Sequence, residues 1–415
     1  MRLVLSSIGF VVLCVFLGMG ACAQIAGLED LVAPTPDASH PSSGDGGPAC
    51  SCPGCSLVVS DPSGTPQSLV TVGESVYWVD PGDDCANDGH VLTVPTTGGA
   101  LAEVAGNLAS PLSITTDGVS LYWYETGAGN IDKLTIGSTE VELIASGFNF
   151  DSADNGWNAP SATSTSTRIL PDTSILAVVD GGVYFATTNG FDASIETEYE
   201  VWKVPNREGA VAEGVVGSLV NDNDASSGIP DADFLPESGG TQQLDPQSFA
   251  VGEDSLFWIN CDSAPCTGTS CSSGTDCFSI WKIPLSGSNP VPVEVISDLE
   301  GPVNLFVSAS TAYLVDYASN RFESFNAAGD SSQNPTSLGG VQVAPWALTH
   351  DQDFVYWTTL GTGGNGGDVV KYPLKGGSAT TIASGLPAPA ALAVDDTNVY
   401  WVDTVYDVIC KAPKR

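Results

Sequence analysis

The sequence contains very few cations. Lys and Arg together number 12 in 415 residues, against 49 Asp and Glu, which gives a formal charge of −37. Nucleic acids and anionic lipid headgroups are bound through clustered cations that release counterions. The composition therefore excludes both as partners. An acidic body instead attracts cations or basic proteins, or simply keeps the chain soluble.

Histidine is also scarce, with His40, His90 and His350 as the three copies. A nucleophilic hydrolase needs a base that an acid orients, and no local motif places one beside these residues. The sequence also lacks a Gly-x-Ser-x-Gly elbow, a P-loop and a His-Glu-x-x-His helix. No motif therefore supports an enzymatic function, and binding is the favoured class.

The one long apolar run lies at the N-terminus. Arg2 precedes an apolar stretch over 3–17, shorter than the ~20 residues of a membrane span, and small residues then lead to Cys22. This order predicts an export signal over 1–21. The alternatives for Cys22 are lipidation, or a plain thiol after ordinary signal-peptidase cleavage nearby.

The Gly-Ala-Cys ending resembles the bacterial lipobox, although Met19 replaces the usual leucine. The resemblance implies an acylated Cys22, which anchors a protein without a transmembrane helix. Ala23, where an Asp would resemble an inner-membrane retention signal, favours the outer membrane, on its periplasmic or its exposed side. Residues 22–54 include a Pro/Ser/Gly-rich stretch that cannot bury a core, which predicts a tether.

An aromatic pair recurs seven times, each time between a short apolar run and a third run that often ends in Pro. The pairs are Tyr77-Trp78, Tyr122-Trp123, Tyr184-Phe185, Phe257-Trp258, Tyr313-Leu314, Tyr356-Trp357 and Tyr400-Trp401. With a fourth run, each unit has four strands and a period of at least ~45 residues, which is typical of a propeller blade. Because the aromatic residues alternate between blade faces, we expect them to form the core.

These repeats resemble the YWTD-type and NHL-like propeller families, over roughly Leu57 to Arg415. The resemblance and the repeat count predict an all-β propeller over 55–415 with seven four-stranded blades. Six blades are the alternative, because the copy at Tyr313-Leu314 is weak. We expect a monomer, since nothing in the repeats indicates a second copy.

The two ends of the propeller domain complement each other. The last unit has three strands and no fourth, while an orphan strand at Leu57 to Ser60 precedes the first complete unit. Pairing them would remove an open sheet edge, so we predict closure by strand exchange between the termini. Cysteines nearby suggest a disulfide between Cys55 and Cys410.

Other cysteines lie close together in one loop. An exported chain meets an oxidising compartment, so we expect two local disulfides among four residues, with a zinc cluster as the alternative. They are Cys261, Cys266, Cys271 and Cys277.

Five lysines occupy the same place in the third strand of five units. They are Lys133, Lys203, Lys282, Lys371 and Lys411. We interpret them as a feature of strand register: the aliphatic stems pack on the blade and the ammonium groups stay in water.

The long insertions fall only in connections that emerge at one end of the blades. In an up-and-down blade, the loops between strands two and three emerge at the same end as the connections to the next blade. All long segments belong to these two classes, so they should share one face, where loops on a rigid scaffold usually bind. We therefore expect a binding or scaffold module for an envelope or extracellular protein or glycan. The alternative is a hydrolase or lyase at the propeller mouth.

Carboxylates are frequent in these insertions. The candidates for the binding face are Asp83, Asp84, Asp88, Asp222, Asp224 and Asp233. Calcium is the one cofactor that the sequence raises, because several carboxylate oxygens can hold this hard ion. Its candidate ligands are Asp80, Asp83, Asp84 and Asp88, and plain solvation of an acidic loop is the alternative.

Overall fold

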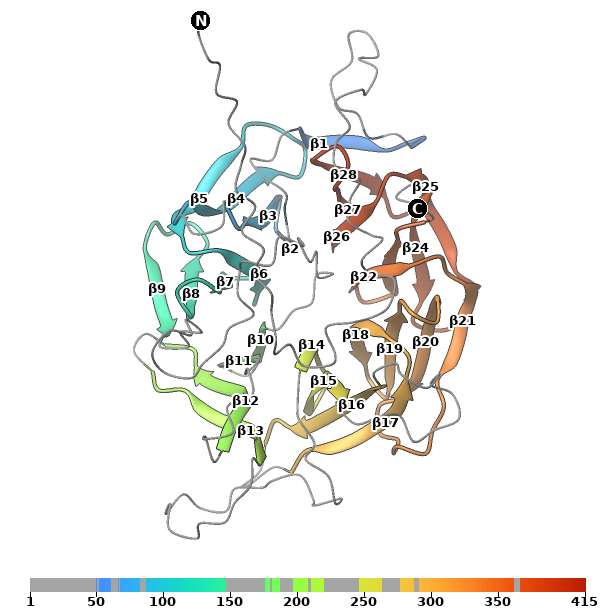
Figure 1. The fold of residues 1–415 in the computed structure, drawn as a ribbon. Coiled ribbons are helices and arrows are strands. Elements are labelled where there is room, and N and C mark those ends of the chain that lie inside the picture. The colour runs from blue at the N-terminus through green and yellow to red at the C-terminus, as the bar shows by residue number, and fades with distance from the viewer. Residues whose placement is uncertain are drawn as a thin grey trace, which may run out of the picture.

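A computed structural model describes residues 50, 52–60, 66, 68–82, 87–146, 176–179, 181–186, 197–207, 210–219, 246–262, 277–286, 291–361 and 366–415. In these ranges, 28 strands form seven four-stranded antiparallel sheets, which stand around a ring (Figure 1). The fold is a seven-bladed β-propeller, as the repeat predicts. The six-bladed alternative is wrong, because the weak copy at Tyr313 belongs to a complete blade.

The blades are numbered along the chain, and their strands run from the centre outwards. Blades 1 to 3 are β2 (Ser68–Val72), β3 (Ser75–Asp80), β4 (Gly89–Pro95), β5 (Ala102–Leu108); β6 (Pro111–Thr116), β7 (Ser120–Glu125), β8 (Asn130–Thr135), β9 (Val141–Ala145); and β10 (Leu176–Val179), β11 (Gly182–Ala186), β12 (Thr197–Pro205), β13 (Glu213–Leu219). Blades 4 and 5 are β14 (Pro246–Val251), β15 (Ser255–Asp262), β16 (Cys277–Pro284), β17 (Val293–Leu299); and β18 (Pro302–Ser308), β19 (Thr311–Asp316), β20 (Arg321–Asn326), β21 (Thr336–Val341). Blades 6 and 7 are β22 (Pro345–His350), β23 (Phe354–Thr359), β24 (Gly367–Pro373), β25 (Thr380–Leu386); and β26 (Pro389–Val394), β27 (Asn398–Asp403), β28 (Val408–Pro413), β1 (Ser56–Ser60).

The termini close the ring. The first strand of the chain, β1, pairs antiparallel with β28 as the outer strand of blade 7, with Ser56 opposite Lys411 and Leu57 opposite Cys410. Figure 1 shows the two strands side by side. This confirms the predicted strand exchange, which removes an open edge that would otherwise be available for pairing with another chain.

The predicted disulfide between Cys55 and Cys410 is wrong. Cys410 is bonded to Cys50, and Cys55 is bonded to Cys52. A turn explains the exchange of partners: the amide of Cys55 donates to the carbonyl of Cys52 at 3.1 Å, which brings these two residues together. The turn also folds the preceding chain back toward β28, where Cys50 meets Cys410.

The aromatic pairs form the core between blades, as expected. Five tryptophans of the repeat are fully buried: Trp78, Trp123, Trp258, Trp357 and Trp401. The apolar clusters around them combine residues of neighbouring blades. One four-stranded blade exposes two apolar faces, so only stacking in a closed ring buries both.

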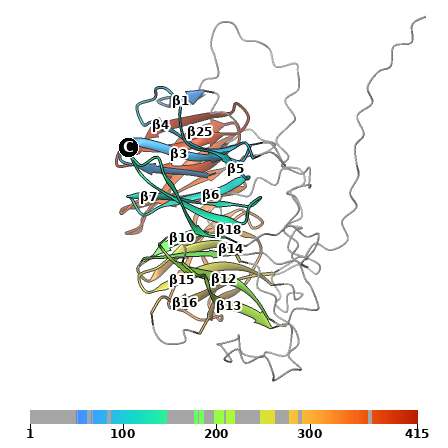
Figure 2. The same cartoon turned by 90° about the vertical axis from the view of Figure 1, so that its left-hand side faces the viewer.

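The two ends of the ring differ in their connections. Strands one and two of every blade are joined by two or three residues, and we call this side the turn end. It also bears the links between strands three and four, and the C-terminus, on the left in Figure 2, marks it. The opposite side, the insert end, bears the links between strands two and three and those between blades. No helix in the described ranges is long and apolar enough to cross a membrane.

The third-strand lysines do more than predicted. Each lies opposite the first aromatic residue of its repeat, as the register interpretation requires. The ammonium groups of Lys282, Lys371 and Lys411, however, donate to main-chain carbonyls of the next blade. The expectation that the ammonium groups only stay in water is therefore wrong for these three, because the neighbouring turn offers each of them an acceptor.

Candidate functional site

The insert end is bounded by buried polar residues that lie three positions after the first aromatic residue of the repeat, at or near the end of the second strand. In six blades these are Asp80, Glu125, Asn260, Asp316, Thr359 and Asp403, and the corresponding residue of blade 3 lies outside the described ranges. Most accept hydrogen bonds from backbone amides nearby: Glu125 Oε2 from Ala109 at 2.8 Å, and Asp316 Oδ1 from Ser319 at 2.8 Å. The residues therefore fix the start of each loop and of the next blade. They hold the insertions in place.

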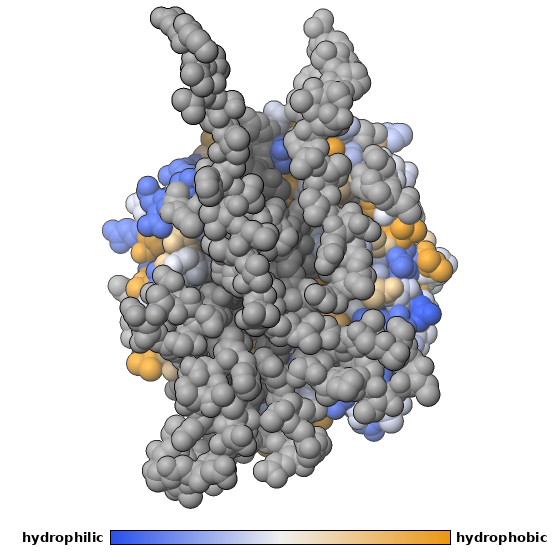
Figure 3. Space-filling view, in the orientation of Figure 1, coloured by the Kyte–Doolittle hydropathy of each residue, from blue (hydrophilic) through white to orange (hydrophobic). Residues whose placement is uncertain are grey.

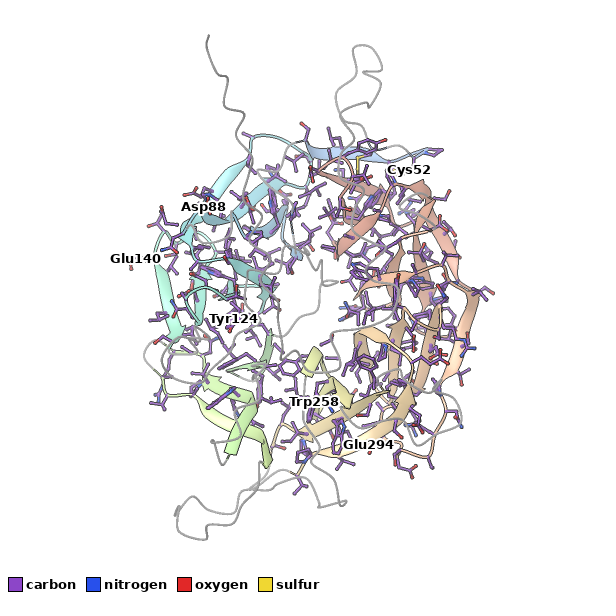
Figure 4. The ribbon with its side chains drawn as sticks, in the orientation of Figure 1. Cys52, Asp88, Tyr124, Glu140, Trp258 and Glu294 are labelled. Atoms are coloured by element: carbon purple, nitrogen blue, oxygen red, sulfur yellow. A yellow bond between two sulfur atoms is a disulfide. The ribbon has the colours of Figure 1, made fainter. Side chains whose placement is uncertain are left out.

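Two of the four predicted calcium ligands are described. Asp80 Oδ1 accepts the amide of Gly82 at 3.1 Å, and Asp88 lies half-buried just before β4 (Figure 4). Gly82 has φ +72°, and a Cβ there would come within 2.3 Å of Asp88 Oδ1. Asp80 and Asp88 thus approach the same glycine, while Asp83 and Asp84 lie outside the described residues. The calcium site stays a prediction.

Other predicted site residues fall largely beyond the described ranges. These are Cys22, Asp222, Asp224, Asp233, Cys266 and Cys271. Cys261 and Cys277 are described in backbone only, at the ends of the paired strands β15 and β16. The remaining part of the chain contains no group of three or more His, Cys, Asp or Glu arranged to hold a metal ion, as far as the structure describes it.

A buried carboxyl pair lies in blade 2. Asp132 on β8 is opposite Trp123, and Glu125 follows two residues after that tryptophan on the same sheet face. Burial, together with a hydrogen bond to Glu125 and its charge, raises the pKa of Asp132 to about 8. Glu125 also accepts the indole N–H of Trp123 at 3.4 Å. The pair faces blade 1, and the raised pKa favours the protonated form of Asp132 at neutral pH.

Blade 5 contains the equivalent pair. Glu323 takes the place of Asp132 in the repeat, and Asp316 takes the place of Glu125. Burial and the charge of Asp316 raise the pKa of Glu323 to about 7, against the effect of Arg321, whose guanidinium is 3.6 Å from the carboxylate. Strongly shifted groups mark candidate sites, but both pairs are buried inside blade interfaces and bonded to backbone or indole groups. Their arrangement suits a structural role.

The two described histidines lie in different blades. His90 Nδ1 is 2.9 Å from Glu103 Oε2 within blade 1. His350 ends the innermost strand of blade 6 at the turn end, and its ring stacks on Phe306 of blade 5 with centroids 3.6 Å apart. Loss of water from that ring face lowers the pKa of His350. His40 lies outside the described residues.

Acidic and apolar side chains alternate around the rim of the ring. Figure 3 shows hydrophilic and hydrophobic patches intermixed along its periphery. Glu140 and Glu294 lie at this rim in Figure 4, whereas Tyr124 and Trp258 lie within their blades. The rim alone therefore presents no continuous apolar surface in the view shown.

The comparisons with known proteins support the fold. No protein-family model and no curated protein match the chain. A virginiamycin B lyase from Staphylococcus aureus, solved as a catalytically inactive variant with quinupristin, is 13% identical with a TM-score of 0.50. The match covers 86% of this chain and 97% of the lyase chain. At this identity, the likeness shows a β-propeller and nothing of activity.

Two further solved structures match with lower TM-scores. A structure of a nidogen/laminin complex is 15% identical, with a TM-score of 0.33 and coverage of 74% of this chain and 75% of that chain. The calcium-binding protein regucalcin from Agrobacterium tumefaciens is 11% identical, with a TM-score of 0.39 and coverage of 74% and 90%. The arrangement of the seven sheets, together with the match to the lyase, defines the class of the protein as a β-propeller.

Proposed function

We propose that this protein is an exported, lipid-anchored propeller that binds an envelope or extracellular protein or glycan through its insert end. The placement of the long connections carries the proposal. Four segments between strands are longer than every connection at the turn end, where the links between strands one and two have two or three residues and the link 327–335 is the longest: 146–175, 187–196, 220–245 and 263–276. All four leave the insert end, and together they span one sector of the ring from blade 2 to blade 4.

The charge of these segments indicates the kind of partner. Their carboxylates are Asp151, Asp154, Asp172, Asp192, Glu196, Asp222, Asp224, Asp231, Asp233, Glu237, Asp245 and Asp276, and Arg168 is the one cation. Like charges attached to one sector produce a negative potential that steers cationic partners, and salt screens it beyond about 8 Å at ~0.15 M. We therefore propose a partner with a basic surface, bound more weakly as ionic strength rises.

The anchor is the second part of the proposal. Acyl chains on Cys22, followed by a Pro/Ser/Gly-rich stretch, would hold the propeller at the outer membrane with its ring free to bind. Metabolic labelling with a fatty acid, with and without globomycin, tests this part. Equal labelling of wild type and Cys22→Ser contradicts the lipid anchor and leaves the binding proposal intact.

Trimming tests the binding face. In one variant, segments 188–195 and 221–244 are replaced by short turns, which leaves β12, β13 and β14 intact. The matched control lacks 287–290, in the link between strands three and four of blade 4 at the turn end. We expect the first variant to lose capture of purified basic envelope proteins, and the control to retain both capture and its salt dependence. Equal capture by the two folded variants would contradict the proposal.

A further inference from the structure

One position of the third strand holds a lysine in most blades but not in all, and a cavity lies beside one of the blades without it. The third-strand residue opposite the first aromatic of each pair is a lysine in five blades. Blade 1 has Thr93 opposite Tyr77, and blade 5 has Ser324 opposite Tyr313. The role of the lysine in the other blades shows what a side chain at this place can bind.

Lys282 in blade 4 illustrates that role. Its ammonium lies 5.8 Å from the ring centroid of Phe257 and donates to the carbonyl of Ala327 in blade 5 at 2.8 Å. The same bond joins Lys371 to the carbonyl of Lys414, and Lys411 to the carbonyl of Thr96. Each acceptor directly follows a third strand, and its amide donates back to the turn between strands one and two. We call the contact between one blade and the carbonyl after the third strand of the next blade a junction. Each of these junctions therefore binds an alkylammonium group that the preceding blade supplies.

The junction between blades 1 and 2 has the same acceptor without the lysine. Ile136 directly follows β8, and its amide donates to the carbonyl of Val119 at 3.0 Å, as its counterparts do. Thr93 cannot reach Ile136, because its hydroxyl donates to Val76 in its own blade at 2.9 Å. A cavity of about 230 Å³ lies at this place, and both Thr93 and Ile136 line it. Residues 137–139, in the link between β8 and β9 at the turn end, also line it.

Blade 5 provides the comparison. The hydroxyl of Tyr313 itself donates to the carbonyl of Leu374 at 3.5 Å, at the equivalent position in blade 6. The ring of Phe306 lies beside Tyr313, with centroids 6.1 Å apart. This chain's own side chains therefore fill the place of the lysine at that junction. Of the two described junctions without lysine, the one between blades 1 and 2 has the cavity.

The walls of the cavity have the chemistry of an alkylammonium site. Val104 and Ile136, which are half-buried, supply an apolar surface for an aliphatic stem, and Tyr77 supplies an aromatic ring. Glu103 lies at the rim with a side chain 57% exposed, where its carboxylate adds charge-assisted acceptors. We propose that this junction binds an alkylammonium group from outside the chain, either a free amine or a lysine side chain of a partner protein.

Calorimetric titration of the purified chain tests the site. The probes are n-pentylamine and a short acetylated peptide with one lysine, and the controls are n-pentanol and the same peptide with norleucine. We expect saturable one-to-one binding of both cationic probes and at least tenfold weaker binding of both neutral controls. Tighter binding of the peptide than of pentylamine indicates a partner's lysine, and equal binding indicates a small amine. Absence of saturable binding, or equal binding of the neutral controls, overturns the proposal.

Three variants locate the binding. Thr93→Lys introduces the lysine of the other blades, so it should raise the melting temperature and weaken amine binding at least tenfold. Thr93→Val, the matched control, keeps the size of the side chain and should bind as wild type does. Glu103→Gln should weaken binding about threefold. Unchanged binding by a folded Thr93→Lys overturns the assignment. Should that variant not fold, unchanged binding by Glu103→Gln overturns it instead.

Discussion

Blades 2 and 7 use one position of the repeat in different ways. The third-strand residue just before the lysine lies opposite the second aromatic of the pair: Asp132 opposite Trp123 in blade 2, and Cys410 opposite Trp401 in blade 7. Both side chains are buried, Asp132 at 6% exposure and Cys410 at 1%. Burial and the neighbouring Glu125 raise the pKa of Asp132. Cys410 forms a covalent bond to the chain before β1.

The comparison shows what the repeat does and does not specify. The position holds Leu92 in blade 1, Trp281 in blade 4 and Val370 in blade 6. The aromatic residue opposite it defines the blade, so the position itself accepts apolar, acidic or cross-linked side chains. A buried polar group is tolerated where its atoms are hydrogen-bonded. We therefore expect substitutions of Cys410 and of Asp132 to change the free energy of unfolding by different amounts. We also expect the effect of the Asp132 substitution to depend on pH.

Removing the cross-link of blade 7 should have the largest effect. The bond between Cys50 and Cys410 spans 360 residues, and a closed loop of this length restricts the unfolded chain strongly. We expect Cys50→Ala with Cys410→Ala to lower the free energy of unfolding by about 2–5 kcal/mol, measured by urea denaturation. The control, Cys52→Ala with Cys55→Ala, opens a bond that spans 3 residues and should cost less. Equal losses in the two double variants would contradict this account.

The acid pair of blade 2 should make stability depend on pH. Because the pKa of Asp132 is raised to about 8, the folded chain holds a proton that the unfolded chain releases near pH 4. Its stabilising effect is complete below that pH and is lost as pH rises through 8. We expect Asp132→Asn to gain on the order of 2 kcal/mol relative to wild type between pH 6 and 8. Parallel profiles of unfolding free energy for the two proteins would rule this out.

Asp403 in blade 7 provides the matched control. Burial raises its pKa to about 6, although the amides of Val405 and Tyr406 donate to its carboxylate and limit the rise. In the folded chain its proton is therefore half lost at pH 6 and mostly lost by pH 7. We expect Asp403→Asn to change the slope of stability between pH 4 and 6 and to leave most of the decline between pH 6 and 8 unchanged. If Asp403→Asn instead removed the decline of unfolding free energy between pH 6 and 8, the assignment of that decline to Asp132 would be contradicted.

The sequence predicts the architecture because its determinants are local and repeated. Alternating aromatic residues specify which face of each strand is buried, and the missing fourth strand after Lys411 requires a partner from elsewhere in the chain. The orphan strand from Leu57 to Ser60 is the available segment, and it pairs as predicted. Even the weak copy at Tyr313 folds as a blade, since its neighbours in the ring must bury their faces against something.

The contacts that the sequence does not predict depend on backbone geometry or on residues far apart. A disulfide partner depends on how the turn at Cys52 folds the chain back, which the cysteine spacing leaves open. The acceptors of the third-strand lysines are carbonyls, which every residue has. The acid pairs do have a signal in the sequence, because Asp132 and Glu323 stand at a repeat position that is apolar in most other blades. Cys22 and most insert residues lie outside the described ranges, so their roles stay predictions.

The smallest difference between blades 2 and 7 should come from their lysines. The ammonium of Lys411 donates to the carbonyl of Thr96 and so joins blade 7 to blade 1 across the closure of the ring. The ammonium of Lys133 instead lies 3.4 Å from Glu142 of its own blade, whose side chain is 37% exposed. A charged donor on a part-buried carbonyl stabilises more than a screened surface pair. We expect Lys411→Met to cost about 1 kcal/mol in unfolding free energy and Lys133→Met about 0.3 kcal/mol. Equal costs in urea denaturation would mean that the bond across the closure adds nothing beyond packing of the stem, since methionine keeps most of that contact in both blades.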